Sequence, residues 1–81
     1  SGYIILMPSI FTPTPLHISL YRFVRDFLEK NGFAPMYQEI SAGANVPATS
    51  VYRGMKDLKT FGYLKVVPRR KRGILLTSKT L

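Results

Sequence analysis

A tight break in the middle of the chain, residues 44–47, constrains the fold more than any other feature of the sequence. Asn45 tolerates a positive φ, and Pro47 prevents a preceding helix from continuing because it has no backbone N–H to donate. On either side we expect short helices, one at about 36–43 and one at about 48–61. Two short helices joined by a tight turn, the second of them amphipathic, predict a helix-turn-helix.

The segment before these helices has the start, the apolar stripe and the end of a longer helix. Thr14 can cap its N-terminus, and Pro15 suits the first helical position, where no N–H is needed. Residues 31–32, Asn-Gly, favour a left-handed end. We therefore expect a scaffold helix that buries one stripe of side chains. The stripe consists of Leu16, Leu20, Phe23, Val24, Phe27 and Leu28.

A β-hairpin with a basic tip is expected after the third helix. Gly62 ends that helix, residues 63–67 form the first strand and residues 74–77 the returning strand. Leu64 and Val66 alternate with Tyr63, Lys65 and Val67, so the side that carries Leu64 and Val66 is expected to pack on the helices. The turn, at 68–73, contains Arg69, Arg70, Lys71 and Arg72.

Together these segments predict an α+β fold that is mainly α, a three-helix winged helix-turn-helix with a C-terminal two-stranded β wing. We expect the domain to span residues 14–77 and a tail to follow at 78–81. Residues 1–13 form an N-terminal arm whose role the sequence leaves open: residues left from cloning, an extra strand, a dimer contact or a disordered arm. Its apolar run at 3–7 is too short to cross a bilayer.

The charge of the chain narrows the classes of partner. The 81 residues include 12 Lys/Arg and four Asp/Glu, a formal net charge of +8. Residues 63–81 contain six of the basic residues and no acidic one. This balance favours nucleic acid first and an anionic membrane surface second. Because the core accounts for the apolar stripes, no membrane partner is expected.

Catalysis and metal binding are not expected from this composition. With no cysteine, one histidine and four acidic residues, neither a metal cluster nor a catalytic constellation can be assembled. We expect no enzyme activity, no cofactor, no metal and no small-molecule ligand. The main rival to DNA binding is a winged-helix module that contacts protein within a nucleic-acid-associated complex, through the third helix or the arm at 4–7. RNA is less favoured because no aromatic platform is expected on a strand.

The outward face of the third helix supplies the candidate base-reading residues. Small hydroxyl side chains at its N-terminal end, followed by Arg53 one turn later, suit insertion into the major groove of double-stranded DNA. The basic wing suits phosphate oxygens, which supply affinity without sequence information. Tyr37 and Tyr52 are equally compatible with packing at the core edge. We expect base contacts from Thr49, Ser50, Tyr52 and Arg53, and phosphate contacts from Tyr37, Lys56, Arg69, Arg70, Lys71 and Arg72.

Four other residues carry specific expectations. Gly54 lies inside the third helix, where we expect it to allow close packing against the second helix. His17 is expected to be solvent-exposed, and Phe33, like Phe61, to lie in the core. Glu39 is expected to be structural, since beside a basic groove it could orient an arginine but would repel phosphate.

Short motifs with a characteristic order and spacing run through most of the chain. They are residues 24–26 (Val-Arg-Asp), 31–35 (Asn-Gly-Phe-Ala-Pro), 39–40 (Glu-Ile), Leu58, 62–64 (Gly-Tyr-Leu), 72–74 (Arg-Gly-Ile) and Leu76. In this order they resemble the DNA-binding domain of the LexA repressor family, over Thr14 to about Leu76. The resemblance implies a winged domain whose third helix enters the major groove of an operator, as one half of a homodimer on a two-fold site.

The resemblance also implies a base-contacting stretch at the start of the third helix, which adds Ala48 and Pro47 to the reading residues. Pro47 stands where the family has a capping serine, and Tyr52 and Arg53 replace an acidic pair, so a different operator is expected. A cytoplasmic, nucleoid-associated repressor of bacterial, archaeal or phage origin is expected. The family's C-terminal self-cleaving peptidase domain is not among these residues, which leaves open an excised domain or a short stand-alone regulator.

Overall fold

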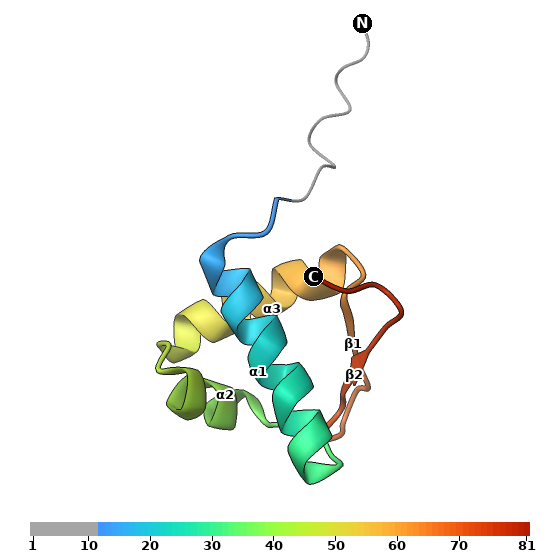
Figure 1. Ribbon diagram of the computed structural model, residues 1–81. Coiled ribbons are helices and arrows are strands. Elements are labelled where there is room, and N and C mark those ends of the chain that lie inside the picture. Colours follow the sequence, from blue (N-terminus) through green and yellow to red (C-terminus); the bar gives the residue numbers. More distant parts are fainter. Residues whose placement is uncertain (1–11) are drawn as a thin grey trace, which may run out of the picture.

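Three helices and a two-stranded sheet make up the computed structural model, which describes residues 12–81 (Figure 1). The two strands are antiparallel, with Leu64 opposite Leu76 and Val66 opposite Ile74. The expected α+β, mainly helical winged-helix class is therefore confirmed. Expectations for residues 1–11 of the N-terminal arm lie outside the described part. The elements are α1 (Pro15–Asn31), α2 (Tyr37–Ala44), α3 (Ala48–Thr60), β1 (Leu64–Val66) and β2 (Ile74–Leu76).

The ends of α1 follow from local chemistry. The Thr14 hydroxyl accepts a hydrogen bond from the backbone N–H of His17, and Pro15 occupies the first turn, where its missing N–H costs nothing. At the other end Gly32 adopts the left-handed conformation at φ 78°. Both ends are as the sequence predicts.

The turn between α2 and α3 is closed by polar contacts as well as by the expected left-handed residue. Asn45 has φ 56° and ends α2. The Ser41 hydroxyl donates to the Val46 carbonyl at 2.6 Å, and the Val46 N–H donates back to the Ser41 carbonyl at 3.0 Å. This reciprocal pair fixes the angle at which the chain enters α3, and the sequence alone did not indicate it.

The core lies between the three helices and the β-ribbon, which contributes Leu64 from one end and Ile74 from the other. In Figure 1, α1 crosses the other two helices while the ribbon lies beside the C-terminal half of α3; α1 contacts both α2 and α3, and α3 contacts β1. No helix among residues 12–81 is long and apolar enough to cross a membrane. The buried apolar residues are Leu20, Tyr21, Val24, Ala34, Ile40, Val51, Met55, Leu58, Leu64 and Ile74.

Two residues expected in the core are exposed. Val66 is 36% exposed because it lines an open groove, although Ile74 opposite it is buried. Phe33 is 46% exposed, and its ring stands edge-on to Phe27 with the centroids 5.8 Å apart. Phe61 is only partly buried. The expectations for Val66 and Phe33 are therefore wrong.

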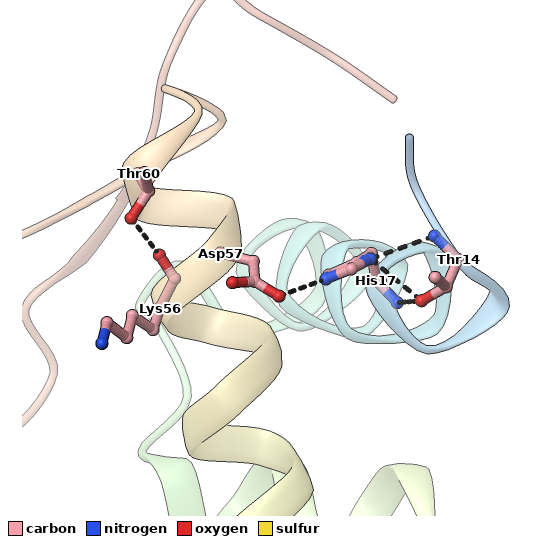
Figure 2. A network of polar contacts seen from close by, with 5 residues as sticks. All are labelled: Thr14, His17, Lys56, Asp57 and Thr60. Atoms are coloured by element: carbon pink, nitrogen blue, oxygen red, sulfur yellow. Dashed lines mark hydrogen bonds and ion pairs between the residues drawn. The ribbon is translucent and has the colours of Figure 1, made fainter. Parts of the chain in front are cut away.

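His17 is buried, not exposed as its sequence position suggested (Figure 2). Its Nδ1 accepts from the Thr14 backbone N–H at 3.0 Å, and its Nε2 lies 2.9 Å from Asp57 Oδ2. Because Nδ1 accepts, the proton lies on Nε2, which donates to the carboxylate. The ring therefore joins the first turn of α1 to α3. The expectation was wrong because the partner is 40 residues away.

Gly54 packs closely against α1, not against α2 as expected. A Cβ built on Gly54 would lie 2.4 Å from Leu20 Cδ1 and 3.6 Å from the Leu16 side chain. Leu20 has no exposed surface. The absence of a side chain at Gly54 thus sets the distance between α1 and α3.

The residues after β2 pack back on the end of α3. The Thr77 hydroxyl donates to the Gly62 carbonyl at 2.6 Å, and Lys79 Nζ donates to the Phe61 carbonyl at 2.8 Å. The Lys79 ammonium also lies 4.7 Å from the centroid of the Tyr63 ring. A cation at this position satisfies a carbonyl at the negative end of the helix.

Candidate nucleic-acid interface

The outer face of α3 is polar and basic. Burial of Val51, Met55 and Leu58 on one side of the helix leaves Thr49, Tyr52, Arg53 and Lys56 exposed on the other, and Ser50 half-buried between them. The sequence predicted this division from helical spacing. Arg53 and Lys56 have no described carboxylate within ion-pair distance, so their charges face solvent.

The N-terminal end of α3 has no side-chain cap. Pro47 precedes the helix with φ −57° and ψ 146°, and its carbonyl accepts the first helical hydrogen bond, from Val51 N–H at 3.0 Å. Ala48 and Thr49 are exposed at this end. Their small side chains leave the backbone of the first turn accessible to a large partner.

The acidic residue of α3 is turned away from this basic face. Asp57 points toward His17 and α1, whereas the neighbouring Lys56 side chain points away from them (Figure 2). The Thr60 hydroxyl donates to the Lys56 carbonyl at 2.9 Å and so occupies a backbone acceptor near the helix end. The His17–Asp57 contact therefore also keeps a negative charge off the outer face.

Two tyrosines connect α2 to the outer face of α3. The rings of Tyr37 and Tyr52 lie 4.9 Å apart between centroids, at 59° to each other. Tyr52 is 62% exposed, whereas Tyr37 is half-buried. Burial raises the pKa of the Tyr37 hydroxyl above its ordinary value, and the nearby Tyr52 raises that pKa further. Tyr37 is therefore neutral at physiological pH and available as a hydrogen-bond donor.

The wing tip presents three cations to solvent. Arg69, Arg70 and Lys71 are exposed, and Arg69 adopts a left-handed conformation at φ 64° that the sequence did not predict. The Val67 N–H donates to the Gly73 carbonyl at 2.8 Å and closes the loop. No described carboxylate pairs with any of these three cations.

Arg72, the fourth basic residue, is bound to the helices. Its Nη1 lies 2.7 Å from Glu39 Oε1, and its Nη2 lies 3.1 Å from Glu39 Oε2. Nη1 also donates to the Ala34 carbonyl at 2.9 Å, and the guanidinium lies 4.6 Å from the centroid of the Phe33 ring. The Arg72 hydrogen bonds, followed by that of the Met36 N–H, lower the pKa of the Glu39 carboxyl. The arginine that Glu39 was expected to orient is therefore Arg72.

An open groove of about 510 Å³ brings several candidate residues together. It runs between the start of α2, the outer face of α3 and the wing tip. Thr49, Arg53, Lys56 and Arg69 lie outside its lining, and Gln38 is a member that sequence reasoning missed. No group of three or more His, Cys, Asp or Glu that could hold a metal ion occurs in the described part. The lining includes Tyr37, Gln38, Tyr52, Val66, Arg70 and Lys71.

The fold and this surface define the class of the protein as a winged helix-turn-helix domain with a basic wing. No family model matches the chain. It is similar to the LexA repressor of Syntrophobacter fumaroxidans (strain DSM 10017 / MPOB), with 33% identity over 63 residues, 76% of this chain. The chain is therefore LexA-like, which confirms the resemblance inferred from its motifs. It spans 31% of the length of this relative.

Proposed function

We propose that this domain binds double-stranded DNA sequence-selectively, as the reading domain of a transcriptional repressor. The observation that carries the proposal is the open groove in which Tyr52 of α3 faces Arg70 and Lys71 of the wing. A helix in the major groove and a cationic loop on the adjacent backbone must reach one duplex together. The name of the similar protein, LexA repressor, agrees with a repressor role.

The outer face of α3 is the proposed base-reading surface. The short side chains of Ala48, Thr49 and Ser50 let the first turn approach base edges closely. Arg53 follows one turn later, where its guanidinium can donate two hydrogen bonds to a guanine. Tyr52 is supported from behind by Tyr37, so its ring needs little ordering on binding. Two copies of the domain would each read one half of a two-fold operator.

Phosphate contacts are proposed for Tyr37, Lys56 and the exposed wing cations Arg69, Arg70 and Lys71. Cations at these positions face solvent without a described acidic partner, so binding a phosphate breaks no ion pair. Each contact releases condensed counterions and therefore makes affinity depend on salt.

Fluorescence anisotropy with labelled duplexes tests the proposal. A randomised duplex and a set of palindromic duplexes are titrated with the protein at several salt concentrations. We expect the affinity to fall steeply with salt for every duplex and to be higher for a subset of the palindromes. Absence of binding at low salt would refute the proposal and favour the rival protein-interaction module.

Two variants separate the proposed roles. Replacing Arg69, Arg70 and Lys71 together by alanine should weaken binding to all duplexes and reduce the slope of log K against log salt by about 2.7, at about 0.9 per contact. Arg53→Ala should instead reduce the preference for the best duplex by about 1–3 kcal/mol. Wing variants that bind as well as wild type at every salt concentration would contradict the wing's role.

A further inference from the structure

Arg72 differs from its three neighbours in the wing tip because its charge is paired with a carboxylate of the same domain. Its guanidinium donates two hydrogen bonds to the Glu39 carboxylate in a bidentate arrangement, with lengths of 2.7 and 3.1 Å, and a third to the Ala34 carbonyl. The central carbon of the guanidinium lies over the Phe33 ring, 4.6 Å from its centroid. Both charged side chains are about two-thirds covered, with 35% and 32% of their surfaces exposed. To reach a DNA phosphate, Arg72 would have to abandon all of these contacts.

The strands of the wing are short and give the exposed loop between them little support of their own. Each strand of the ribbon has three residues, and an isolated two-stranded hairpin is marginally stable at best in water. Leu64, at the end of the ribbon next to α3, and Ile74, at the end next to the wing tip, are both buried in the core. In the loop that joins the two strands, the Arg72 guanidinium links the wing tip to the start of α2. A planar guanidinium bound through two nitrogens fixes orientation as well as distance.

We propose that Arg72 is a positioning residue: through Glu39 it holds the wing tip at the distance and angle from α3 that one duplex requires, and it does not contact phosphate itself. This proposal rests on the DNA binding proposed above. The pairing with Arg72 also explains why an acidic residue, Glu39, is tolerated beside a basic groove. The Glu39 charge is paired with Arg72, so it does not repel the backbone that Arg70 and Lys71 attract.

The order of the wing in the DNA-free protein gives the first test. Backbone 15N relaxation is measured for residues 67 and 69–73 in wild type, in Arg72→Ala and in Arg70→Ala as the matched control. We expect lower order parameters across this loop in Arg72→Ala only, with amides of α1–α3 unchanged in all three proteins. Unchanged order in Arg72→Ala would overturn the proposal whether or not the domain binds DNA.

The sign of the effect of Glu39→Gln on DNA affinity gives the second test. Removing an acidic charge from a DNA-binding surface ordinarily strengthens binding, and Glu29→Gln on the exposed side of α1 provides a control with the same charge change. If Glu39 anchors Arg72, Glu39→Gln should weaken binding about threefold or more instead. A glutamine can still accept from the Met36 N–H at the start of α2, so the helix is kept.

The effects of Arg72→Ala and Glu39→Gln on DNA affinity should also be non-additive. Arg72→Ala alone is expected to weaken binding about tenfold, the cost of ordering a loosened loop on the duplex. Adding Glu39→Gln to Arg72→Ala should cause no further loss, because the contact is already gone. Tighter binding by Glu39→Gln, matching Glu29→Gln, would show that Arg72 is free to act on phosphate and would refute the anchor. If wild type binds no duplex, the DNA-binding proposal fails and the relaxation data alone decide the anchor.

Discussion

Replacing Gly54 by alanine is expected to destabilise the domain, although alanine is the better helix former. In an exposed helix the change would stabilise by about 1 kcal/mol. Here the new Cβ would lie 2.4 Å from Leu20 Cδ1, closer than two carbon atoms can approach. Leu20 has no exposed surface, so its side chain has no solvent into which it can move.

The magnitude follows from these two opposing effects. Inserting a methyl group into a packed core costs about 1–3 kcal/mol, which exceeds the gain of about 1 kcal/mol in helix propensity. We therefore expect Gly54→Ala to lose about 1 kcal/mol of unfolding free energy. In a domain of this size such a loss lowers the melting temperature by roughly 4–8 °C. The displaced α3 should also bind DNA less tightly, because the helix moves relative to the wing.

Urea and thermal denaturation, followed by circular dichroism, measure the effect. Gly43→Ala is the matched control, since a Cβ there would meet the ring of Phe23, which is only half-buried and can turn toward solvent. That variant should change stability by less than about 0.5 kcal/mol. In a Leu20→Ala background, which removes the clash, Gly54→Ala should become stabilising by up to about 1 kcal/mol. If Gly54→Ala stabilises the otherwise wild-type domain, the close approach of α1 and α3 is not limited by this contact.

Three further predictions concern the polar contacts. His17→Ala should lower the free energy of unfolding, measured by urea denaturation, by about 1–3 kcal/mol, because it removes hydrogen bonds at a buried position. Asp57→Ala should lower it by only about 1 kcal/mol, because that side chain is 44% exposed. Equal losses in the two variants would contradict this prediction. Since Arg72 lowers the pKa of Glu39, that group's contribution to stability is complete above its ordinary pKa of 4.5 and is lost as pH falls through the lowered value, so the melting temperatures of wild type and Glu39→Gln should converge in acid. Because burial raises the pKa of the Tyr37 hydroxyl, this group's contribution to stability is complete below pH 10.0 and is lost as pH rises through the raised value. Ultraviolet titration of wild type and of Tyr37→Phe should show that the tyrosine absent from the variant is one that titrates late.

The helices and the turn could be predicted from sequence because their determinants are local. Thr14 and Pro15 start α1, Gly32 ends it, and Asn45 with Pro47 sets the break before α3. Each of these effects acts within about one helical turn of the residue that causes it. The alternation of buried and exposed residues on α3 follows from helical period alone. These features therefore needed no knowledge of the tertiary structure.

The polar partners could not be predicted because they lie far apart in sequence. His17 meets Asp57 across 40 residues, and Arg72 meets Glu39 across 33. The position of Glu39 beside an expected basic groove indicated that it could orient an arginine, but nothing local distinguished Arg72 from the three cations before it. Exposure of Phe33 was missed for the same reason, since its ring supports Arg72 at the surface and does not fill the core.

The candidate interface was predictable as two separate surfaces, but not as one groove. Helical spacing put Tyr52 and Arg53 on the outer face of α3, and the basic run defined the wing tip. That Tyr52, Arg70 and Lys71 line the same hollow depends on the length and twist of the ribbon and on packing against α2. The individual DNA contacts remain predictions.

The two ends of α3 are held in place very differently. At the C-terminal end the Lys79 ammonium and the Thr77 hydroxyl bind the carbonyls of Phe61 and Gly62, whereas at the N-terminal end Pro47 offers no side-chain acceptor. Local opening should therefore cost least in the first turn, and amide hydrogens there should exchange fastest. An anion bound at that turn would replace the missing cap, so ordering of the first turn and anion binding would be coupled. The part of the helix proposed to meet the bases would then be most rigid when it lies on the duplex.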